Sequence, residues 1–382
     1  MRVLHLYGGD LFGGIQTYLI TLARFRSLCP SMEPEFALCY SGILSQELQA
    51  QNATIHWLGK VRMRYPWTVL RARGALRKLL QEGNYDVVVC HSIWNQFIFG
   101  PVVRRVGLPL VFYQHNIFSG RHWFERWAGR ALPDYAICNS RYTQTSLANI
   151  YPGVESQVIY FPVSRPKQFS AQDRTATRSE LQTPAEAVVI IQVSRMDSWK
   201  GHVLHLDALA RLAQVPGWVA WIVGGPQLPP EHQYFAGLQK QAARLGISDR
   251  VRFLGQRTDV ERLLAAADIF CQPNVGSPEP FGIVFVEALG AGLPVVSTRI
   301  GAALEIVDDS CGILVTPENV EALAHALKQL LVETDVRRDL SGGAPKRAQS
   351  LCAPEKQMKI LEQVLSATIS RYRENNGVYQ NV

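Results

Sequence analysis

Two glutamates stand eight positions apart in the second half of the chain, within the segment SPEPFGIVFVEALGAG at residues 277–292. Glu279 precedes Pro280, and because proline disfavours helical backbone at the residue before it, we expect Glu279 in a loop. Glu287 lies inside the helix that follows, among apolar residues. A carboxylate there can accept hydrogen bonds from the two neighbouring hydroxyls of a ribose, while the free amides of the first helical turn face its phosphates. A stabilising interaction with the helix N-terminus is the alternative for Glu287.

Two cations follow an apolar run earlier in the same half. Arg195 and Lys200 lie in VSRMDSWKGH, between a predicted strand and a helix that we expect to begin near Gly201. Two fixed cations at one strand end suit a diphosphate, because arginine offers a bidentate fork and lysine a point charge. Two solvated surface cations are the alternative.

A glycine-rich turn follows the first apolar run of the chain. In GGDLFGGIQTYL, Gly13 and Gly14 precede a helix that we expect to start near Ile15. Glycines at such a turn let backbone amides approach a phosphate. The spacing does not match G-x-G-x-x-G, and the second apolar run ends without an acidic residue to hold a dinucleotide ribose. These two departures disfavour a nicotinamide cofactor.

One histidine directly follows a predicted strand. His115 ends the run PLVFYQH, at the strand end where parallel sheets bind their ligands. A reacting-centre residue is one interpretation, and a hydrogen-bonded structural histidine is the other. His91, after DVVVC, is a second candidate, which we place on the side of an acceptor.

We expect no metal and no cofactor. The chain contains no D-x-D sequence. An enzyme that relies on a divalent cation to hold a diphosphate needs clustered carboxylates.

Strands and helices must hold these residues in place. Short apolar runs that alternate with amphipathic stretches predict such strands and helices. In the first half the predicted strands are 3–7, 36–40, 54–58, 87–90, 110–113 and 136–138. In the second half they are 188–193, 219–223, 251–254, 269–272, 295–297 and 313–315. Helical patterns in the first half are 15–27, 69–81 and 141–150. Such runs predict parallel sheets covered on both faces, hence an α/β protein of two doubly wound, Rossmann-like domains with a cleft between the strand ends.

The domain boundary is expected within residues 160–184, a polar stretch with prolines and no clear periodicity. We therefore assign residues 1–165 and 166–353 to the two domains. A last helix, within 354–382, has no strand after it.

Composition restricts the class of protein. The 382 residues are 47% hydrophobic and 19% charged, which is typical of a globular protein long enough for two domains. We find no N-terminal signal and no apolar run long enough to span a bilayer. The seven cysteines form no CxxC pair, which favours buried free thiols in a reducing cytoplasm.

The net charge of +7 is concentrated in two stretches of the first half. Residues 60–78 carry lysines and arginines and no acid, and residues 121–130 combine three arginines with Trp123 and Trp127. Basic residues beside aromatic ones suit an anionic membrane or a polyanionic acceptor, with solvated helix faces as the alternative. Nucleic acid is not an expected partner, because no binding module is present.

These motifs together resemble one enzyme family. EPFGIVFVE is similar to the E-x7-E motif of the retaining, nucleotide-sugar-dependent glycosyltransferases of family 4, which have the GT-B fold. GGDLFGGIQTYL resembles the family's N-terminal glycine loop, and VSRMDSWKG its diphosphate clamp. The resemblance implies an N-terminal domain on the acceptor side and a C-terminal domain that binds the nucleotide sugar. It also implies a last helix that returns to the N-terminal domain.

The resemblance assigns donor binding to Gly13, Gly14, Arg195, Lys200, Glu279, Phe281, Gly282, Ile283 and Glu287. Within this set, Arg195 and Lys200 would hold the diphosphate and Glu287 the ribose. Four residues would carry catalysis: His115, Arg195, Lys200 and Glu279. The family often has Asp and Glu where this chain has Asn116 and Gln16, which affects local hydrogen bonding rather than donor binding.

The resulting expectation is a metal-independent, retaining hexosyltransferase. We expect transfer of glucose from UDP-glucose to a glycan or lipid-linked acceptor in polysaccharide assembly, in the cytoplasm at the inner face of the membrane. A GDP-mannose-dependent mannosyltransferase, a sugar-nucleotide epimerase of the same fold and a non-catalytic nucleotide-sugar sensor are the alternatives.

Overall fold

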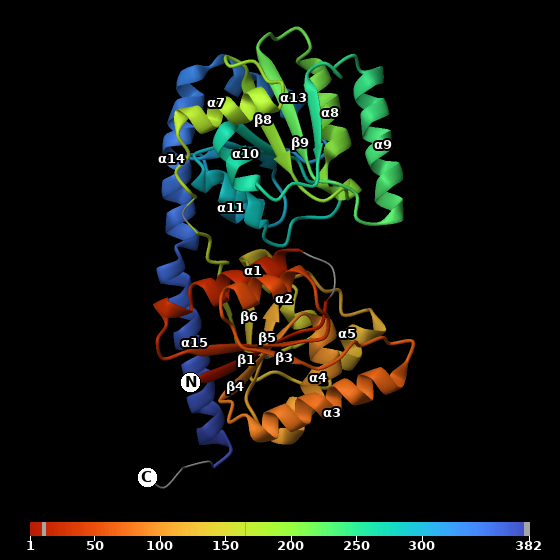
Figure 1. Ribbon diagram of the computed structural model, residues 1–382, viewed down its shortest axis with the longest axis vertical. Coiled ribbons are helices and arrows are strands. Elements are labelled where there is room, and N and C mark those ends of the chain that lie inside the picture. Colours follow the sequence, from red (N-terminus) through yellow and green to blue (C-terminus); the bar gives the residue numbers. More distant parts are fainter. Residues whose placement is uncertain (10–12, 165, 378–382) are drawn as a thin grey trace. The chain divides into compact units, whose positions relative to one another are not determined.

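The computed structural model describes residues 1–9, 13–164 and 166–377 (Figure 1). The chain divides into two compact units. The N-terminal unit contains Met1–Pro162 and the chain from Cys352 onward, and the C-terminal unit is Val163–Leu351. Each unit is built on its own parallel β-sheet. The predicted α/β class with two Rossmann-like domains is therefore confirmed.

The described strands of the N-terminal unit form one sheet in the order β3-β2-β1-β4-β5-β6-β7. They are β1 (Arg2–Tyr7), β2 (Glu33–Leu38), β3 (Ile55–Trp57), β4 (Val87–His91), β5 (Leu110–Gln114), β6 (Tyr135–Cys138) and β7 (Ser156–Val158). Strand order reverses between β1 and β4, which pair in parallel. The sequence did not predict β7, because this short edge strand is polar and half-exposed.

Helices cover both faces of this sheet. They are α1 (Gly14–Arg24), α2 (Ile43–Ala50), α3 (Pro66–Glu82), α4 (Ile93–Val106), α5 (Trp123–Ala128) and α6 (Arg141–Gln144). Figure 1 shows α1 and α2 on one side of the strands and α3 and α4 on the other. Side chains alternate along a strand, so Leu4 and Leu6 of β1 join the core with α3 and α4, while His5 faces the opposite side. The predicted helix 141–150 is shorter than expected, because after α6 the chain continues as a 3₁₀ turn, Leu147–Asn149.

The last helix, α15 (Pro354–Asn375), belongs to the N-terminal unit. Its Leu361 and Leu365 are buried. Arg373 at its end donates a 2.7 Å hydrogen bond to the Asp86 carboxylate, and Arg371 forms an ion pair with Glu155. The N-terminal unit is thus made of two stretches that lie far apart in the sequence.

The described strands of the C-terminal unit form a second parallel sheet, in the order β10-β9-β8-β11-β12-β13. They are β8 (Val188–Val193), β9 (Trp218–Val223), β10 (Val251–Gly255), β11 (Ile269–Gln272), β12 (Val295–Thr298) and β13 (Gly312–Val315). Strand order reverses between β8 and β11. Ligands of doubly wound sheets bind beyond the carboxyl ends of the strands at this reversal.

The helices of this unit are α7 (Ala171–Glu180), α8 (His202–Arg211), α9 (Pro229–Arg244), α10 (Val260–Ala266), α11 (Ile283–Gly290), α12 (Ala303–Ile306), α13 (Val320–Val332) and α14 (Thr334–Cys352). In Figure 1, α8 and α9 lie on one side of the strands and α7, α10 and α11 on the other.

The stretch 160–184, which shows no helical periodicity, contains α7. Polar contacts hold this helix in place. The Ser170 hydroxyl caps its first turn, and Arg174 and Arg178 each lie 2.6 Å from the carboxylate of Asp268. The sequence of α7 has no regularly spaced apolar residues, so the search for helical periodicity did not predict this helix.

Candidate functional site

A buried ion pair lies at the reversal of strand order in the C-terminal unit. Lys200 ends the 3₁₀ turn Ser198–Lys200 that follows β8, and Glu279 lies in the loop after β11. The Nζ atom of Lys200 forms an ion pair with Oε2 of Glu279, and the two side chains are only 11% and 12% exposed. Gln272 at the end of β11 donates to the same carboxylate oxygen at 3.3 Å. The fold therefore brings these two predicted residues together.

Buried amide side chains hold the turn that carries Lys200. Gln192 of β8 donates a 2.9 Å hydrogen bond to the Lys200 carbonyl, and its own side-chain oxygen lies 2.8 Å from Nδ1 of His205. The Lys200 ammonium lies 3.9 Å from the centre of the Trp199 ring, within range of a cation–π interaction. Sequence reasoning missed Gln192 and Gln272. The available signal was a glutamine near the end of both apolar strands, β8 and β11.

Two glycines allow close backbone approach at the site. Gly201 has φ of 75°, and a Cβ atom there would lie 1.7 Å from the Pro273 carbonyl oxygen. Gly301 has φ of 60°, and its Cβ would lie 2.7 Å from the Glu279 carbonyl oxygen. The same carbonyl accepts a 3.0 Å hydrogen bond from the amide of Ala302. Only glycine suits such positions, so both glycines fix the backbone that carries the ion pair.

Arg195 lies on the same turn as Lys200 but has a different partner. One of its terminal nitrogens is 2.5 Å from the Asp197 carboxylate, and its side chain is 44% exposed. The two cations are therefore paired separately, Arg195 with Asp197 and Lys200 with Glu279. A diphosphate at this turn would compete with carboxylates for both of them.

Helix α11 begins at Ile283, next to the ion pair. Its N-cap is Gly282, with φ of 83°, and a Cβ there would lie 2.5 Å from the Phe285 ring. Gly282 has no side chain to cap the helix, and no side-chain cap is found there in the described part of the chain. Phe281, just before it, is buried. An uncapped helix start of this kind presents amide hydrogens and a positive dipole end to an anion.

Glu287 lies in the second turn of α11 between the buried residues Val286 and Ala288. Among the described residues its carboxylate has no hydrogen-bond or ion-pair partner. Burial, with a smaller contribution from the Glu261 carboxylate, raises the pKa of Glu287 to about 7. A half-buried acid that the fold does not use is available for a ligand.

His115 follows β5 in the N-terminal unit and is only 4% exposed. Its Nε2 lies 3.0 Å from Nδ1 of His91, and Nε2 of His91 lies 2.9 Å from Nδ1 of His5. Burial lowers the pKa of His115 to about 3, so its imidazole is neutral. The structure thus places both candidate histidines in a buried hydrogen-bonded row, which sequence reasoning did not foresee.

The two predicted glycines lie at the start of α1. Gly13 is the N-cap, its amide donates a 3.2 Å hydrogen bond to the side chain of Gln16, and Gly14 is the first helical residue. A Cβ atom at Gly13 would meet nothing within 4 Å, so packing does not require this glycine. The preceding residues 10–12 of the glycine-rich turn lie outside the described residues.

The two basic stretches and the start of α4 carry exposed aromatic and apolar side chains. These are Trp67 and Leu70 of α3, Trp94 of α4, and Trp123 and Trp127 of α5. Trp94 contacts the rings of Trp123 and Phe124, and Arg130 lies 3.9 Å from the centre of the Trp127 ring. Arg73, by contrast, donates to the Ile98 carbonyl and serves the fold. The surface of α3, α4 and α5 therefore combines cations with aromatic side chains.

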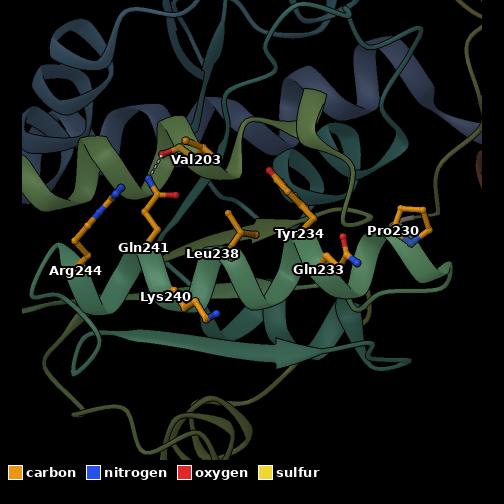
Figure 2. Close-up of a pocket in the computed structure, with 9 residues that line it drawn as sticks. Val203, Pro230, Gln233, Tyr234, Leu238, Lys240, Gln241 and Arg244 are labelled. Atoms are coloured by element: carbon orange, nitrogen blue, oxygen red, sulfur yellow. Dashed lines mark hydrogen bonds between the residues drawn. The ribbon is translucent and has the colours of Figure 1, made fainter.

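A groove between α8 and α9 is separate from the predicted residues. Figure 2 shows Val203 of α8 on one side of it and Tyr234, Leu238 and Gln241 of α9 on the other. None of the predicted site residues lines it.

Two further features are absent from the described residues. No group of three or more His, Cys, Asp or Glu side chains there could hold a metal ion. No helix in the described part of the chain has both the length and the hydropathy to cross a bilayer.

Two Rossmann-like units, with a charged site at the strand reversal of the second, are features of the GT-B class of proteins. Two family models match the chain: Glycosyltransferase Family 4 over residues 12–164 and Glycosyl transferases group 1 over residues 173–347. The chain belongs to glycosyltransferase family 4 and is a glycosyltransferase.

Curated relatives and solved structures agree with this assignment. The lipopolysaccharide core biosynthesis glycosyltransferase LpsE of Rhizobium meliloti is 35% identical over 43% of this chain and 45% of its own length. The D-inositol 3-phosphate glycosyltransferase of Saccharomonospora viridis is 31% identical over 72% of this chain and 69% of its own length. The chain thus spans less than half of the first relative and about two thirds of the second. Anabaena Alr3699/HepE, solved in complex with UDP and glucose, has a TM-score of 0.83 and 26% identity, covering 96% of this chain and all of that one.

Proposed function

We propose that this glycosyltransferase moves a hexose from a nucleoside-diphosphate sugar to a glycan or lipid-linked acceptor, with retention of configuration at the anomeric carbon. The observation that carries the proposal is the Lys200–Glu279 pair beside the uncapped start of α11, at the strand reversal of the C-terminal unit. This site brings a cation, a carboxylate and the amides at the start of a helix close together.

The cations and the helix would bind the diphosphate. Lys200 and Arg195 each exchange a carboxylate partner for a phosphate oxygen, and the first amides of α11 donate to the same group. Charge then builds up on the leaving diphosphate as the glycosidic bond breaks. Fixed donors that face this charge stabilise the transition state more than the ground state. The proposal requires no metal ion.

Glu287 would hold the ribose. Its carboxylate has no partner within the described structure and can accept one hydrogen bond from each hydroxyl of a vicinal diol. Glu279, with the amides of Phe281, Gly282 and Ile283, would position the transferred sugar.

Retention would follow from a front-face reaction. The bond from the anomeric carbon to the diphosphate oxygen breaks while the acceptor oxygen bonds to the same face of the sugar. The departing phosphate oxygen takes the acceptor proton, which leaves a nucleoside diphosphate and a glycoside. The resemblance assigns His115 to the transferred sugar in this step. A trapped glycosyl-enzyme would disprove this mechanism.

The donor that we propose is UDP-glucose. The support is Alr3699/HepE, which matches nearly the whole chain and was solved with UDP and glucose bound.

The acceptor that we propose is a lipid-linked glycan at an anionic membrane. The surface of α3, α4 and α5 supports this choice, because it presents arginines together with exposed tryptophans. The name of LpsE, a lipopolysaccharide core enzyme, points to an acceptor of the same kind.

A two-stage experiment tests the proposed function. Thermal shifts with UDP, GDP, ADP and their sugars first identify the nucleotide, and we expect UDP and UDP-glucose to give the largest stabilisation. Incubation with the donor and a panel of glycolipids, followed by NMR of the product, then shows the anomeric configuration. An inverted product or an epimerised donor would contradict the proposal, and donor binding without nucleotide release would indicate a sensor.

A further inference from the structure

Three histidines from adjacent strands form a row inside the N-terminal unit. His5 lies in β1, His91 ends β4 and His115 follows β5, and these strands are neighbours in the sheet. The ring nitrogens of His5 and His91 are 2.9 Å apart, and those of His91 and His115 are 3.0 Å apart. His5 and His91 are fully buried and His115 is 4% exposed. The row therefore runs from the core to the carboxyl end of the sheet.

The charge state of the three rings restricts how protons are placed in the row. Burial lowers the pKa of His5 and of His115 to about 3, and the pKa of His91 is lowered by burial and by its two neighbours. All three imidazoles are neutral, and a neutral imidazole has one N–H donor and one acceptor nitrogen. His91 bonds through both nitrogens, so it donates to one neighbour and accepts from the other. The donors must point in the same direction along the whole row.

Only two proton arrangements satisfy this condition. If His5 donates to His91, then His91 donates to His115, and Nδ1 of His115 carries a proton. If the direction is reversed, Nδ1 of His115 is an acceptor. That nitrogen is buried and has no hydrogen-bond partner among the described residues. The same is true of Nε2 of His5, at the other end of the row. The direction of the donors along the row therefore sets whether Nδ1 of His115 donates or accepts.

No other polar contact among the described residues fixes the His115 ring. Tyr113 stacks on it with centroids 4.5 Å apart, and Tyr18 and Phe161 pack near it. The Tyr113 hydroxyl donates to the Ile159 carbonyl and is not bonded to His115. Aromatic packing restricts the plane of the ring, but only His91 distinguishes its two nitrogens.

We propose that His91 and His5 are positioning residues for His115, which set its ring orientation and its tautomer through this hydrogen-bonded row. The inference rests on the proposed function insofar as His115 acts at the transferred sugar. In this arrangement the ring orientation and the protonated nitrogen of His115 are set within the N-terminal unit before the sugar binds, so neither needs to change during the reaction.

Three variants of the full chain test the proposal. His91→Phe removes both hydrogen bonds and keeps a ring, whereas His91→Gln keeps one donor and one acceptor. Tyr113→Phe is the matched control. It changes another buried ring that packs against His115 but leaves all hydrogen bonds of His115 in place. Nitrogen-15 NMR of the histidine rings reports the tautomers in the free enzyme, and kcat and KM for the donor report catalysis.

We expect His115 to show a single tautomer in the unmodified protein, in Tyr113→Phe and in His91→Gln. In His91→Phe we expect averaged ring-nitrogen shifts and a kcat at least about tenfold lower, with KM for the donor changed less than about threefold. His91→Gln should restore kcat to within about threefold. An unchanged His115 tautomer in His91→Phe, or an equal loss of kcat in Tyr113→Phe, would overturn the proposal. Absence of sugar transfer by the unmodified protein would refute the proposed function and leave the NMR test of the row intact.

Discussion

Lys200 and Glu279 lie 79 positions apart in the sequence and form an ion pair at the strand reversal of the C-terminal unit. Both side chains are largely buried, so water does little to weaken the attraction. The free protein therefore keeps the proposed phosphate-binding ammonium neutralised by an internal carboxylate. A diphosphate that enters the site must share Lys200 with Glu279.

Replacing Glu279 with Gln should separate binding from turnover. The variant removes the negative charge beside the proposed diphosphate, so the affinity for UDP should rise about threefold to tenfold. The kcat should fall by about 100-fold, because the transferred sugar loses its charged hydrogen-bond acceptor. Isothermal titration with UDP and an assay of UDP release measure the two effects. Glu321→Gln is the control, because Glu321 pairs with Arg211 at the surface and is 76% exposed. A loss of UDP affinity in Glu279→Gln would contradict the competition described above.

Removing either proposed diphosphate cation should reduce turnover. Lys200→Ala and Arg195→Ala should each lower kcat by about 100-fold to 1,000-fold, because charge on the leaving group loses a fixed counter-charge. Arg211→Ala, at an exposed ion pair, should leave kcat unchanged. Steady-state kinetics of all three variants check this. Unchanged kinetics in both site variants would mean that the site lies elsewhere.

The Glu287 carboxylate should make donor binding depend on pH. Its pKa of about 7 means that it is mostly protonated at pH 6 and mostly ionised at pH 8. Only the ionised form accepts from both ribose hydroxyls, so the affinity for UDP-glucose should rise about tenfold between these pH values. UDP-glucose is the appropriate ligand, because its diphosphate does not titrate in this range. Titration calorimetry of the unmodified protein and of Glu287→Gln, which should bind weakly at both pH values, tests the assignment.

The same residue should lower the stability of the free protein. The folded-state pKa of Glu287 lies above the usual 4.5, so folding becomes less favourable as the pH rises from about 4.5 to 7 and stays so above it. Glu287→Gln should therefore increase the free energy of unfolding at pH 8 by up to about 3 kcal/mol, with a small effect at pH 4.5. Urea denaturation at the two pH values measures the difference. Equal effects at both would show that the carboxylate is not destabilised by burial.

Two glycines with the same backbone conformation should differ in their tolerance of a methyl group. Gly201 and Gly217 have φ of 75° and 76°, but only at Gly201 does a new Cβ collide with backbone, 1.7 Å from the Pro273 oxygen. Gly217→Ala should cost about 1 kcal/mol of backbone strain, and Gly201→Ala several kcal/mol more. Thermal denaturation and UDP binding of both variants test this. Similar melting temperatures of the two variants would show that the backbone of the turn after β8 can shift to accommodate a methyl group at little cost in stability.

Turnover should not require a divalent cation. With Lys200, Arg195 and the amides of α11 serving the diphosphate, dialysis against EDTA should leave kcat within about twofold of its initial value. Assays in EDTA and in magnesium decide the point, and strict dependence on magnesium would contradict the proposal.

The chemistry-bearing residues were easier to predict than their contacts. Arg195, Lys200 and Glu279 each follow an apolar strand, and strand ends converge in a parallel sheet, so their shared location could be inferred. The pairing of Lys200 with Glu279, and of Arg195 with Asp197, depends on side-chain geometry that spacing does not encode.

The pattern of apolar residues did not predict elements that are held by polar contacts. Helix α7 depends on the bonds of Arg174 and Arg178 to Asp268, and β7 is a short polar edge strand. The imidazole row was missed for a related reason. His5 lies within an apolar strand, where a single polar residue gives no signal of its partners in strands far along the sequence.

The placement of α15 has a consequence for biosynthesis. This helix completes the N-terminal unit, yet the ribosome releases residues 163–351 before it. During that interval the nascent N-terminal unit leaves uncovered the surface that later receives Leu361 and Leu365. The C-terminal unit is one continuous stretch, so it can finish folding before the N-terminal unit although it is translated later.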